Sequence, residues 1–296
     1  MILQRFTANL DVFPHNNIQH YFLKYILGAV RIYGIGTNHR VYWTVPNDGS
    51  WSYLTSNPDE WIWRIVIDGD TIYGIVSDGS VYEISVHGGS WTQIAPPDMI
   101  DLAYWNGTLY GVGTDYGVYR TVPNNGSWSL LTKNCNKECY GEQISRITIS
   151  FYSGTIYGIG TDGSVFYYQD EIDSWIPSGA PPDMIELASW NDRLYGIGKD
   201  NRVYWLKCPY GGACDGSWIP LTNNSTEWFS RIVIHGDTMY GIGAYEAYLY
   251  VVYEISVHGG LWTKITPPNV IDLAVHTFGK LMLIKSIKNR YEFSEK

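Results

Sequence analysis

The sequence predicts an all-β fold, a β-propeller of four-stranded antiparallel blades, from three recurring features. A strand resembling Tyr-Gly-Ile-Gly returns about every 40 residues, at Tyr33, Tyr73, Tyr110, Tyr157, Tyr195 and Tyr240. A polar hairpin turn and a second strand follow each copy, as in Thr161-Asp162-Gly163 before Val165. Each unit then places a Trp at the start of a third strand, at Trp51, Trp91, Trp128, Trp175, Trp218 and Trp262. An apolar fourth strand completes the unit, and stacked units of this kind are typical of propeller blades.

Composition supports one globular, sheet-rich domain over residues 1–296. Hydrophobic residues make up 45% of the chain and charged residues 17%, which excludes a disordered polymer. The 31 Gly and 13 Pro are spread along the length, as expected for many tight turns. No segment has the composition of a linker, so we expect a single domain.

Counting the strands predicts seven blades. Beyond six complete units, residues 281–285 and 290–293 resemble the first two strands of a further unit. Residues 2–6 and 21–29 supply a plausible third and fourth strand, so the two ends together would complete a composite seventh blade. Such a blade removes exposed sheet edges and closes the ring. A ring of six blades with loosely attached ends is the alternative.

The units alternate in the charge that follows their loops. Odd units carry Arg64, Arg146 and Arg231 in the fourth strand, four residues after Glu60, Glu142 and Glu227. Even units have a Pro-Pro loop and then Asp101, Glu186 and Asp272 at the same position. Lys24 falls at this position in the composite blade. We expect neighbouring blades to exchange salt bridges or to line a polar channel of balanced charge, and the alternating Arg argues against a metal held by the carboxylates.

Charge and motifs exclude several function classes. A formal net charge of -9 disfavours binding to nucleic acid or to an anionic membrane surface. No apolar stretch near the start is long enough to cross a bilayer, and none resembles a signal peptide. Localisation therefore stays open, with an extracellular place slightly favoured because Cys135 with Cys139 and Cys208 with Cys214 are spaced for local disulfides.

No catalytic or cofactor site is recognisable in the sequence. The seven His residues do not combine with Ser, Cys or Asp into a nucleophile motif. The glycines lie within expected strands rather than between a strand and a helix, so they do not form a phosphate-binding loop. We therefore expect a non-catalytic protein without metal or cofactor.

The repeat resembles the tachylectin and tectonin type of propeller lectins. Leu109-Tyr110-Gly111-Val112 and the turn Thr161-Asp162-Gly163 carry the likeness, together with the recurring Trp. The resemblance implies carbohydrate binding at several equivalent sites near the blade junctions, and hence avidity for multivalent glycans on cell surfaces or microbes. The alternation of odd and even units departs from those families.

Candidate sugar-binding residues lie in the loops that precede the fourth strands. An aromatic ring for the apolar face of a sugar and a carboxylate for its hydroxyl groups occur together in Glu60-Trp61 and Glu227-Trp228. Glu142 stands in the third copy, where Gln143 replaces Trp, and Asp98, Asp183 and Asn269 supply polar groups from the Pro-Pro loops. The same pattern is also typical of exposed polar residues in loops beside a half-buried Trp, without a role in sugar binding. A protein-interaction scaffold and a propeller enzyme with an axial site are the alternative functions.

Overall fold

The computed structural model describes residues 30–277, apart from 47–49, 58, 60, 96–97, 124–126, 132–142, 151–152, 179–182, 192, 208–215, 223–227, 246–248 and 269. Residues Arg31–His276 form one compact unit. No helix in the described ranges is long and apolar enough to cross a membrane. The four terminal segments expected to build a seventh blade, together with Lys24, lie outside the described residues, so the prediction of one domain over residues 1–296 is untested there.

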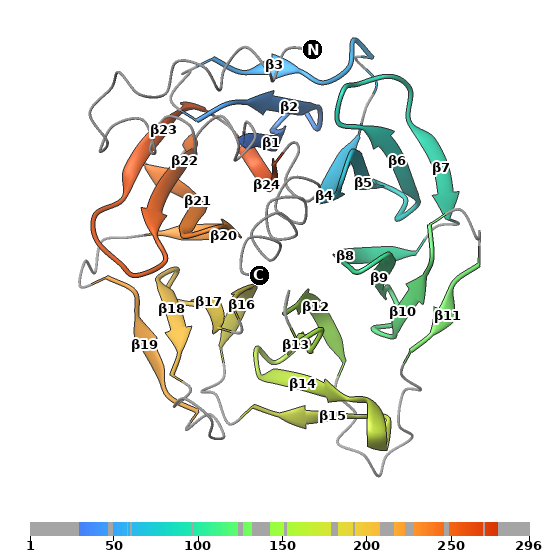
Figure 1. Ribbon diagram of the computed structural model, residues 1–296, viewed down its shortest axis with the longest axis vertical. Coiled ribbons are helices and arrows are strands. Elements are labelled where there is room, and N and C mark those ends of the chain that lie inside the picture. Colours follow the sequence, from blue (N-terminus) through green and yellow to red (C-terminus); the bar gives the residue numbers. More distant parts are fainter. Residues whose placement is uncertain are drawn as a thin grey trace, which may run out of the picture. The chain divides into compact units, whose positions relative to one another are not determined.

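The described strands form six four-stranded antiparallel sheets around a common centre (Figure 1). Blade 1 consists of β24 (Val270–Thr277), β1 (Val30–Gly36), β2 (Val41–Thr44) and β3 (Ser52–Tyr53). Blade 2 consists of β4 (Ile62–Asp68), β5 (Thr71–Val76), β6 (Val81–Ser85) and β7 (Thr92–Ala95), and blade 3 of β8 (Met99–Trp105), β9 (Thr108–Gly113), β10 (Val118–Thr121) and β11 (Ser129–Leu130).

Blades 4 to 6 repeat this order from the centre outward. Blade 4 consists of β12 (Ile144–Ile149), β13 (Ile156–Gly160), β14 (Val165–Gln169) and β15 (Ser174–Pro177), with a short 3₁₀ helix at Asp170–Ile172. Blade 5 consists of β16 (Met184–Trp190), β17 (Arg193–Gly198), β18 (Val203–Leu206) and β19 (Trp218–Pro220), and blade 6 of β20 (Phe229–His235), β21 (Thr238–Tyr245), β22 (Leu249–Ser256) and β23 (Thr263–Pro268).

The four-stranded antiparallel blade is confirmed, but its strands are grouped differently from the sequence unit. The apolar strand that ends each unit is the innermost strand of the next blade, followed by the Tyr-Gly strand, the hairpin partner and the outer Trp strand. One connection therefore crosses each junction between blades, from an outer strand to the next inner strand.

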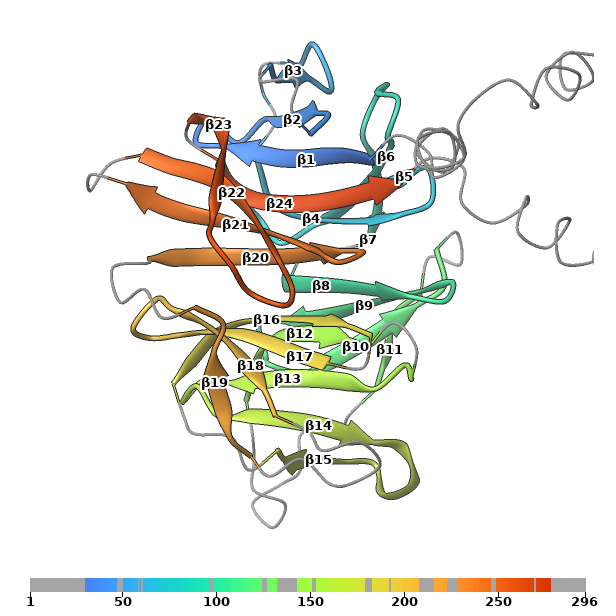
Figure 2. The ribbon, with the colours of Figure 1, turned by 60° about the vertical axis from the view of Figure 1, so that its left-hand side comes forward.

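The prediction of seven blades is wrong, and the six-bladed alternative is correct. In blade 1 the last described strand, β24, is the direct neighbour of β1 (Figure 2). The apolar strand of the sixth unit therefore forms a four-stranded blade with β1, β2 and β3. The closing blade is composite, as expected, but it needs nothing from residues 281–293. The error came from treating the apolar strand as the end of a blade, which left β1 without an inner partner.

Apolar side chains from neighbouring blades bury one another. Tyr195 and Ile197 of β17 share one buried cluster with Phe229 and Ile232 of β20, and similar clusters join blades 2 to 3, 3 to 4, 4 to 5 and 6 to 1. The hydroxyl of Tyr195 also donates to the carbonyl oxygen of Val257 in the next blade at 3.4 Å. Burial between blades is therefore the main source of apolar stabilisation.

In five of the six blades the recurring Trp covers the recurring Gly of its own blade. A Cβ placed on Gly34 of β1 would lie 2.9 Å from Cζ3 of Trp51 and 2.8 Å from Cγ1 of Val270. The corresponding Gly74 of blade 2 leaves more room, with Cη2 of Trp91 and Cγ2 of Ile62 at 3.2 Å. The glycine keeps the ring of the Trp close to the sheet, so both residue types belong to packing.

We expect the substitution Gly34→Ala to lower the free energy of unfolding by about 1–3 kcal/mol, because the new methyl group overpacks a filled core. Gly74→Ala, in the matched position of the next blade, should cost clearly less. Urea unfolding of the two variants and the parent chain measures the difference. Equal stability of the two variants would contradict a steric role for Gly34.

Candidate functional site

In five of the six inner strands a charged residue directly follows a β-bulge. The register shifts between Ile62 and Arg64 in β4 and between Met99 and Asp101 in β8, with the same irregularity in β12, β16 and β20. A bulge inserts one unpaired residue and redirects the side chains next to it. The bulge therefore turns a charge toward the centre of the ring in a strand that is otherwise apolar.

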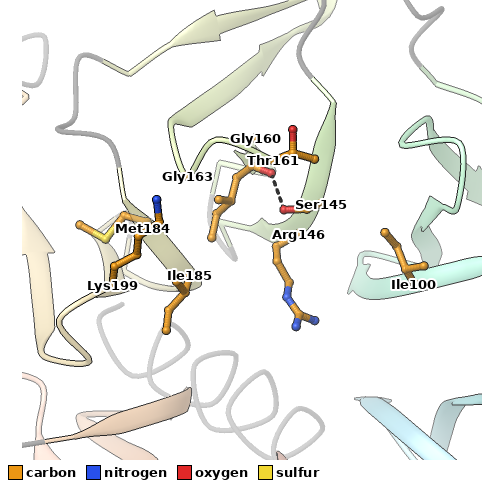
Figure 3. A pocket seen from close by; sticks show the side chains of 10 residues that line it. Ile100, Ser145, Arg146, Gly160, Thr161, Gly163, Met184, Ile185 and Lys199 are labelled. Carbon is orange, nitrogen blue, oxygen red and sulfur yellow. Dashed lines mark hydrogen bonds between the residues drawn. The ribbon is translucent and has the colours of Figure 1, made fainter.

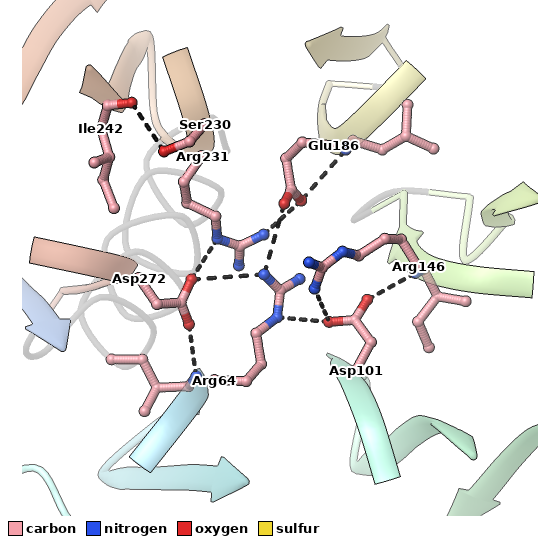
Figure 4. Close-up of polar contacts among 11 residues, drawn as sticks. Arg64, Asp101, Arg146, Glu186, Ser230, Arg231, Ile242 and Asp272 are labelled. Atoms are coloured by element: carbon pink, nitrogen blue, oxygen red, sulfur yellow. Dashed lines mark hydrogen bonds and ion pairs between the residues drawn. The ribbon is translucent and has the colours of Figure 1, made fainter. Parts of the chain in front are cut away.

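The six charged residues form the alternating network expected from the sequence (Figure 4). Arg64 Nε lies 2.6 Å from Asp101 Oδ1, and its Nη1 lies 3.5 Å from Asp272 Oδ1 and 3.7 Å from Glu186 Oε2. Arg231 lies 2.5 Å from both Glu186 Oε1 and Asp272 Oδ1. Arg64 thus reaches across the centre and connects three carboxylates.

The two aspartates of the network also bind the backbone of the following blade. Asp101 Oδ2 accepts the N–H of Ile147 at 2.9 Å, and Asp272 Oδ2 accepts the N–H of Ile65 at 2.8 Å. Each of these amides lies one residue beyond the charged position of its own strand. The network therefore links neighbouring blades through backbone as well as side chains, and it supplies the partners that buried charges require.

The electrostatics of the network favour the charged forms of Glu186 and Arg231. Burial alone would raise the pKa of Glu186, but Arg231 and Arg64 outweigh burial and hold its pKa below the usual value. Burial would likewise lower the pKa of Arg231, yet Asp272 and Glu186 raise it. Glu186 therefore stabilises the fold most strongly when it is ionised.

Arg146 differs from the other two arginines of the network. Its side chain is 41% exposed, whereas those of Arg64 and Arg231 are 8% exposed. Its ion pair within the described residues is a single contact of 3.7 Å between Nη1 and Asp101 Oδ1. Glu186, on the next blade, is instead occupied by Arg231 and Arg64.

A cavity of about 360 Å³ opens beside Arg146 (Figure 3). Its lining comes from the inner strands of blades 3, 4 and 5, from β13 and from two hairpin turns: Ile100, Ser145, Arg146, Ile159, Gly160, Thr161, Gly163, Met184, Ile185 and Lys199. Ile100, Ser145 and Ile185 are the unpaired residues of their bulges. The bulges that direct the charges inward therefore also shape this cavity.

The predicted sugar-binding residues that the structure describes share one position in the repeat. Trp61, Asp98, Asp183 and Trp228 each stand directly before an inner strand, namely β4, β8, β16 and β20. We call the edge of the ring where the inner strands begin the mouth face. These four residues, which come from both loop classes, therefore lie at the mouth face, while Glu60, Glu142, Glu227 and Asn269 lie outside the described residues.

The two loop aspartates hold the backbone of the blade junctions. Asp98 has φ 106° and Asp183 has φ 92°, in the left-handed region that favours glycine. The N–H of Asp183 donates to the carbonyl oxygen of Gly163 at 3.1 Å, and its own carbonyl accepts the N–H of Lys199 at 2.7 Å. The carboxylate of Asp183 also pairs with the Lys199 ammonium. Asp183 therefore already has a local structural role.

An exposed aromatic surface occurs at the junction of blades 1 and 2. It consists of His39, from the turn between β1 and β2, with Trp61 and Trp63. The His39 ring stacks on Trp61 with centroids 5.1 Å apart and lies 4.0 Å from Trp63 at a tilt of 47°. Trp61 is 57% exposed and Trp63 is 49% exposed. The backbone supports this arrangement, because the N–H of Ile62 donates to the carbonyl oxygen of His39 at 3.0 Å.

Polar residues flank His39 in the turn between β1 and β2. The guanidinium of Arg40 lies 3.7 Å above the ring of Tyr53 and donates to the carbonyl oxygen of Thr55 at 2.9 Å. The exposed amide of Asn38 donates to the hydroxyl of Tyr42 at 2.9 Å. Aromatic faces and hydrogen-bonding groups therefore lie along the same turn of blade 1.

The copies of this surface are not equivalent. Trp228 occupies the position of Trp61 at the junction of blades 5 and 6 and is 46% exposed. There Asn201 takes the place of His39 in the hairpin turn, and Ser230 takes the place of Trp63 at the bulge. Trp61 and Trp228 were predicted from the sequence, whereas His39 and Trp63 were not. The pair Trp61-Ile62-Trp63 was a usable signal for Trp63, whereas nothing local distinguishes His39.

Two further sequence predictions concern metals and disulfides. In the ranges that the structure describes, no three His, Cys, Asp or Glu side chains are grouped as metal ligands. Cys135, Cys139, Cys208 and Cys214 lie outside those ranges, so both disulfides stay predictions.

Comparison with known proteins identifies the fold only. No protein-family model matches the chain, and no curated protein matches its sequence. The extracellular domain of a hybrid two-component system from B. thetaiotaomicron has a TM-score of 0.53 at 11% identity, covering 83% of this chain and 35% of that chain. YCF48 from Cyanidioschyzon merolae has a TM-score of 0.51 at 11% identity, covering 78% and 80%.

The tricorn protease is a third similar structure, with a TM-score of 0.52 at 14% identity, covering 70% of this chain and 22% of that chain. This chain therefore spans about a third of the bacterial extracellular domain and about a fifth of the tricorn protease. The resemblance to the tachylectin and tectonin lectins stays a prediction.

We expect Glu186→Gln to lower the free energy of unfolding at pH 7 by about 3 kcal/mol, because it removes one of the two carboxylates that pair with the buried Arg231. The folded-state pKa of Glu186 is depressed, so its contribution is complete above the pKa of about 4.3 of an unfolded glutamate. The contribution is lost as pH falls from there through the folded pKa.

Urea unfolding of the parent and Glu186→Gln at pH 7 and at pH 3.5 measures this effect. The stability difference between the two chains should shrink at the lower pH. A difference that stays constant would show that Glu186 is not ionised in the folded chain.

Proposed function

We propose that this chain is a non-catalytic propeller that binds carbohydrate on its mouth face. The observation that carries the proposal is the aromatic surface of His39, Trp61 and Trp63, in which two indole rings are each about half exposed while the imidazole holds them in place. Large exposed aromatic groups that gather at one junction are typical of a binding surface.

The chemistry of the surroundings suits a sugar. The apolar face of a pyranose ring packs against an aromatic ring, and its hydroxyl groups need donors and acceptors at the rim. Asn38 and Arg40, on either side of His39 in the chain, and Tyr53, whose ring lies under the Arg40 guanidinium, offer such groups. A neutral ligand also avoids the repulsion that an anionic polymer would meet from a chain with a net charge of -9.

The repeat supports one principal site and one weaker site. The Trp228 junction keeps an exposed indole but has Asn201 and Ser230 in place of the two supporting rings. The third copy has Gln143 in place of the Trp. We therefore propose that the junction of blades 1 and 2 contributes most of the affinity, and that Trp228 adds a second contact for a multivalent glycan.

A protein-interaction scaffold is the second candidate function. Trp, Tyr and Arg are enriched among residues that dominate protein–protein binding, and Trp61, Tyr53 and Arg40 are of these types. The candidates differ in one property, since binding to a glycoprotein through its sugar is inhibited by free sugar and binding to its polypeptide is not.

A glycan array with the purified chain, followed by titration of the best ligand, tests the carbohydrate proposal. We expect Trp61→Ala and Trp63→Ala each to weaken binding about tenfold or more, because each removes about 1.4 kcal/mol or more of contact energy. Trp228→Ala is the matched control and should weaken binding to a monovalent sugar less. All three changes are at exposed positions, so the melting temperature should stay close to that of the parent chain.

Two results would count against the proposal. The first is that no glycan on the array binds above background. The second is a protein partner whose capture depends on Trp61 and is insensitive to free sugar, which would favour the scaffold.

A further inference from the structure

The arginine network leaves one guanidinium with spare binding capacity. Arginine has five N–H donors in a planar fork that fits a carboxylate with two parallel hydrogen bonds. Arg231 uses this capacity on two carboxylates at 2.5 Å, and Arg64 contacts three. Arg146 has one ion pair in the described part of the chain, at 3.7 Å, which is too long for a good hydrogen bond.

Arg146 is one of the residues that line the cavity (Figure 3). Its ten lining residues include two cations, Arg146 and Lys199, and no carboxylate. Lys199 is paired with Asp183 outside the lining, so Arg146 is the cation with capacity to spare. Ser145 and Thr161 add hydroxyl groups at the wall.

The remaining wall is apolar. Ile100, Ile159, Met184 and Ile185 surround the polar groups, and the cavity of about 360 Å³ has room for a molecule the size of one sugar ring or one aromatic ring. An apolar wall with one convergent charged group selects a small molecule that carries one anionic group on a less polar body.

Neighbouring carboxylates keep Arg146 positively charged, as an anionic ligand requires. Burial would lower its pKa, but the carboxylates of Asp101 and Glu186 raise it, so the side chain stays a cation. The nearer carboxylate, Asp101, is itself occupied by Arg64 at 2.6 Å and by the N–H of Ile147 at 2.9 Å. An incoming carboxylate therefore competes with one weak ion pair rather than with a tight one.

We propose that this cavity is a binding site for the carboxylate of a small organic ligand, with Arg146 as the anchoring residue. The site lies at blades 3, 4 and 5 and shares no residue with the aromatic surface at blades 1 and 2. It is therefore independent of the carbohydrate proposal.

Isothermal titration calorimetry on the full chain tests the proposal with two carboxylates and their neutral counterparts at fixed ionic strength. The pairs are D-glucuronate with methyl glucoside, and benzoate with benzamide. At least one carboxylate should bind saturably with one site per chain, and its neutral counterpart should bind about tenfold more weakly or not at all.

The variant Arg146→Met removes the charge and keeps the length of the side chain. It should weaken carboxylate binding about tenfold or more, and Arg146→Lys should be intermediate because it keeps the charge but loses the planar fork. Arg193→Met is the matched control, since Arg193 lies over the ring of Trp205 and outside the cavity lining. It should bind as the parent chain does.

Three outcomes would overturn the proposal. One is that neither carboxylate binds saturably, and another is that the neutral counterpart binds equally well. The third is that Arg146→Met binds the carboxylate as tightly as the parent chain while its melting temperature is unchanged. Trp61→Ala should leave carboxylate binding intact, so failure here leaves the carbohydrate proposal untouched.

Discussion

Six charges at the centre of the ring, five of them buried, set the strongest constraint on this fold. A buried charge without a partner costs several kcal/mol, so each inner strand depends on the charge that its neighbours supply. Asp101 and Asp272 strengthen this dependence by accepting backbone N–H groups of the following blade. Apolar packing holds neighbouring blades together face to face, whereas the network requires the blades to meet in a particular order.

Much of the architecture was predictable because it repeats. The Tyr-Gly strand, the hairpin turn and the recurring Trp are local signals, and six copies of each made the four-stranded blade visible. The alternation of Arg with Asp or Glu was also visible and correctly predicted the exchange of ion pairs. The prediction of the blade number failed because the sequence of a strand does not reveal which neighbouring strand it pairs with.

The charge pattern already contained the information needed to reject seven blades. Positive and negative charges can alternate all the way around a ring, with no two like charges side by side, only when the number of positions is even. A seventh position occupied by Lys24 would stand between Asp272 and Arg64 and would bring two cations together. The alternation of charge therefore favours six blades, in agreement with the pairing of β24 and β1.

The candidate sites were harder to predict because both arise where the repeat is broken. Trp61 and Trp228 have similar sequence surroundings. They differ in the hairpin turn of the preceding blade, which supplies His39 next to Trp61 and Asn201 at the Trp228 junction. Arg146 likewise has the same sequence pattern as Arg64 and Arg231. Its exposure follows from the reach of Arg64 across the centre, which occupies Glu186 and leaves Arg146 with one distant partner. In a molecule whose repeated parts serve packing, these two departures from symmetry are therefore the places where binding specificity can reside.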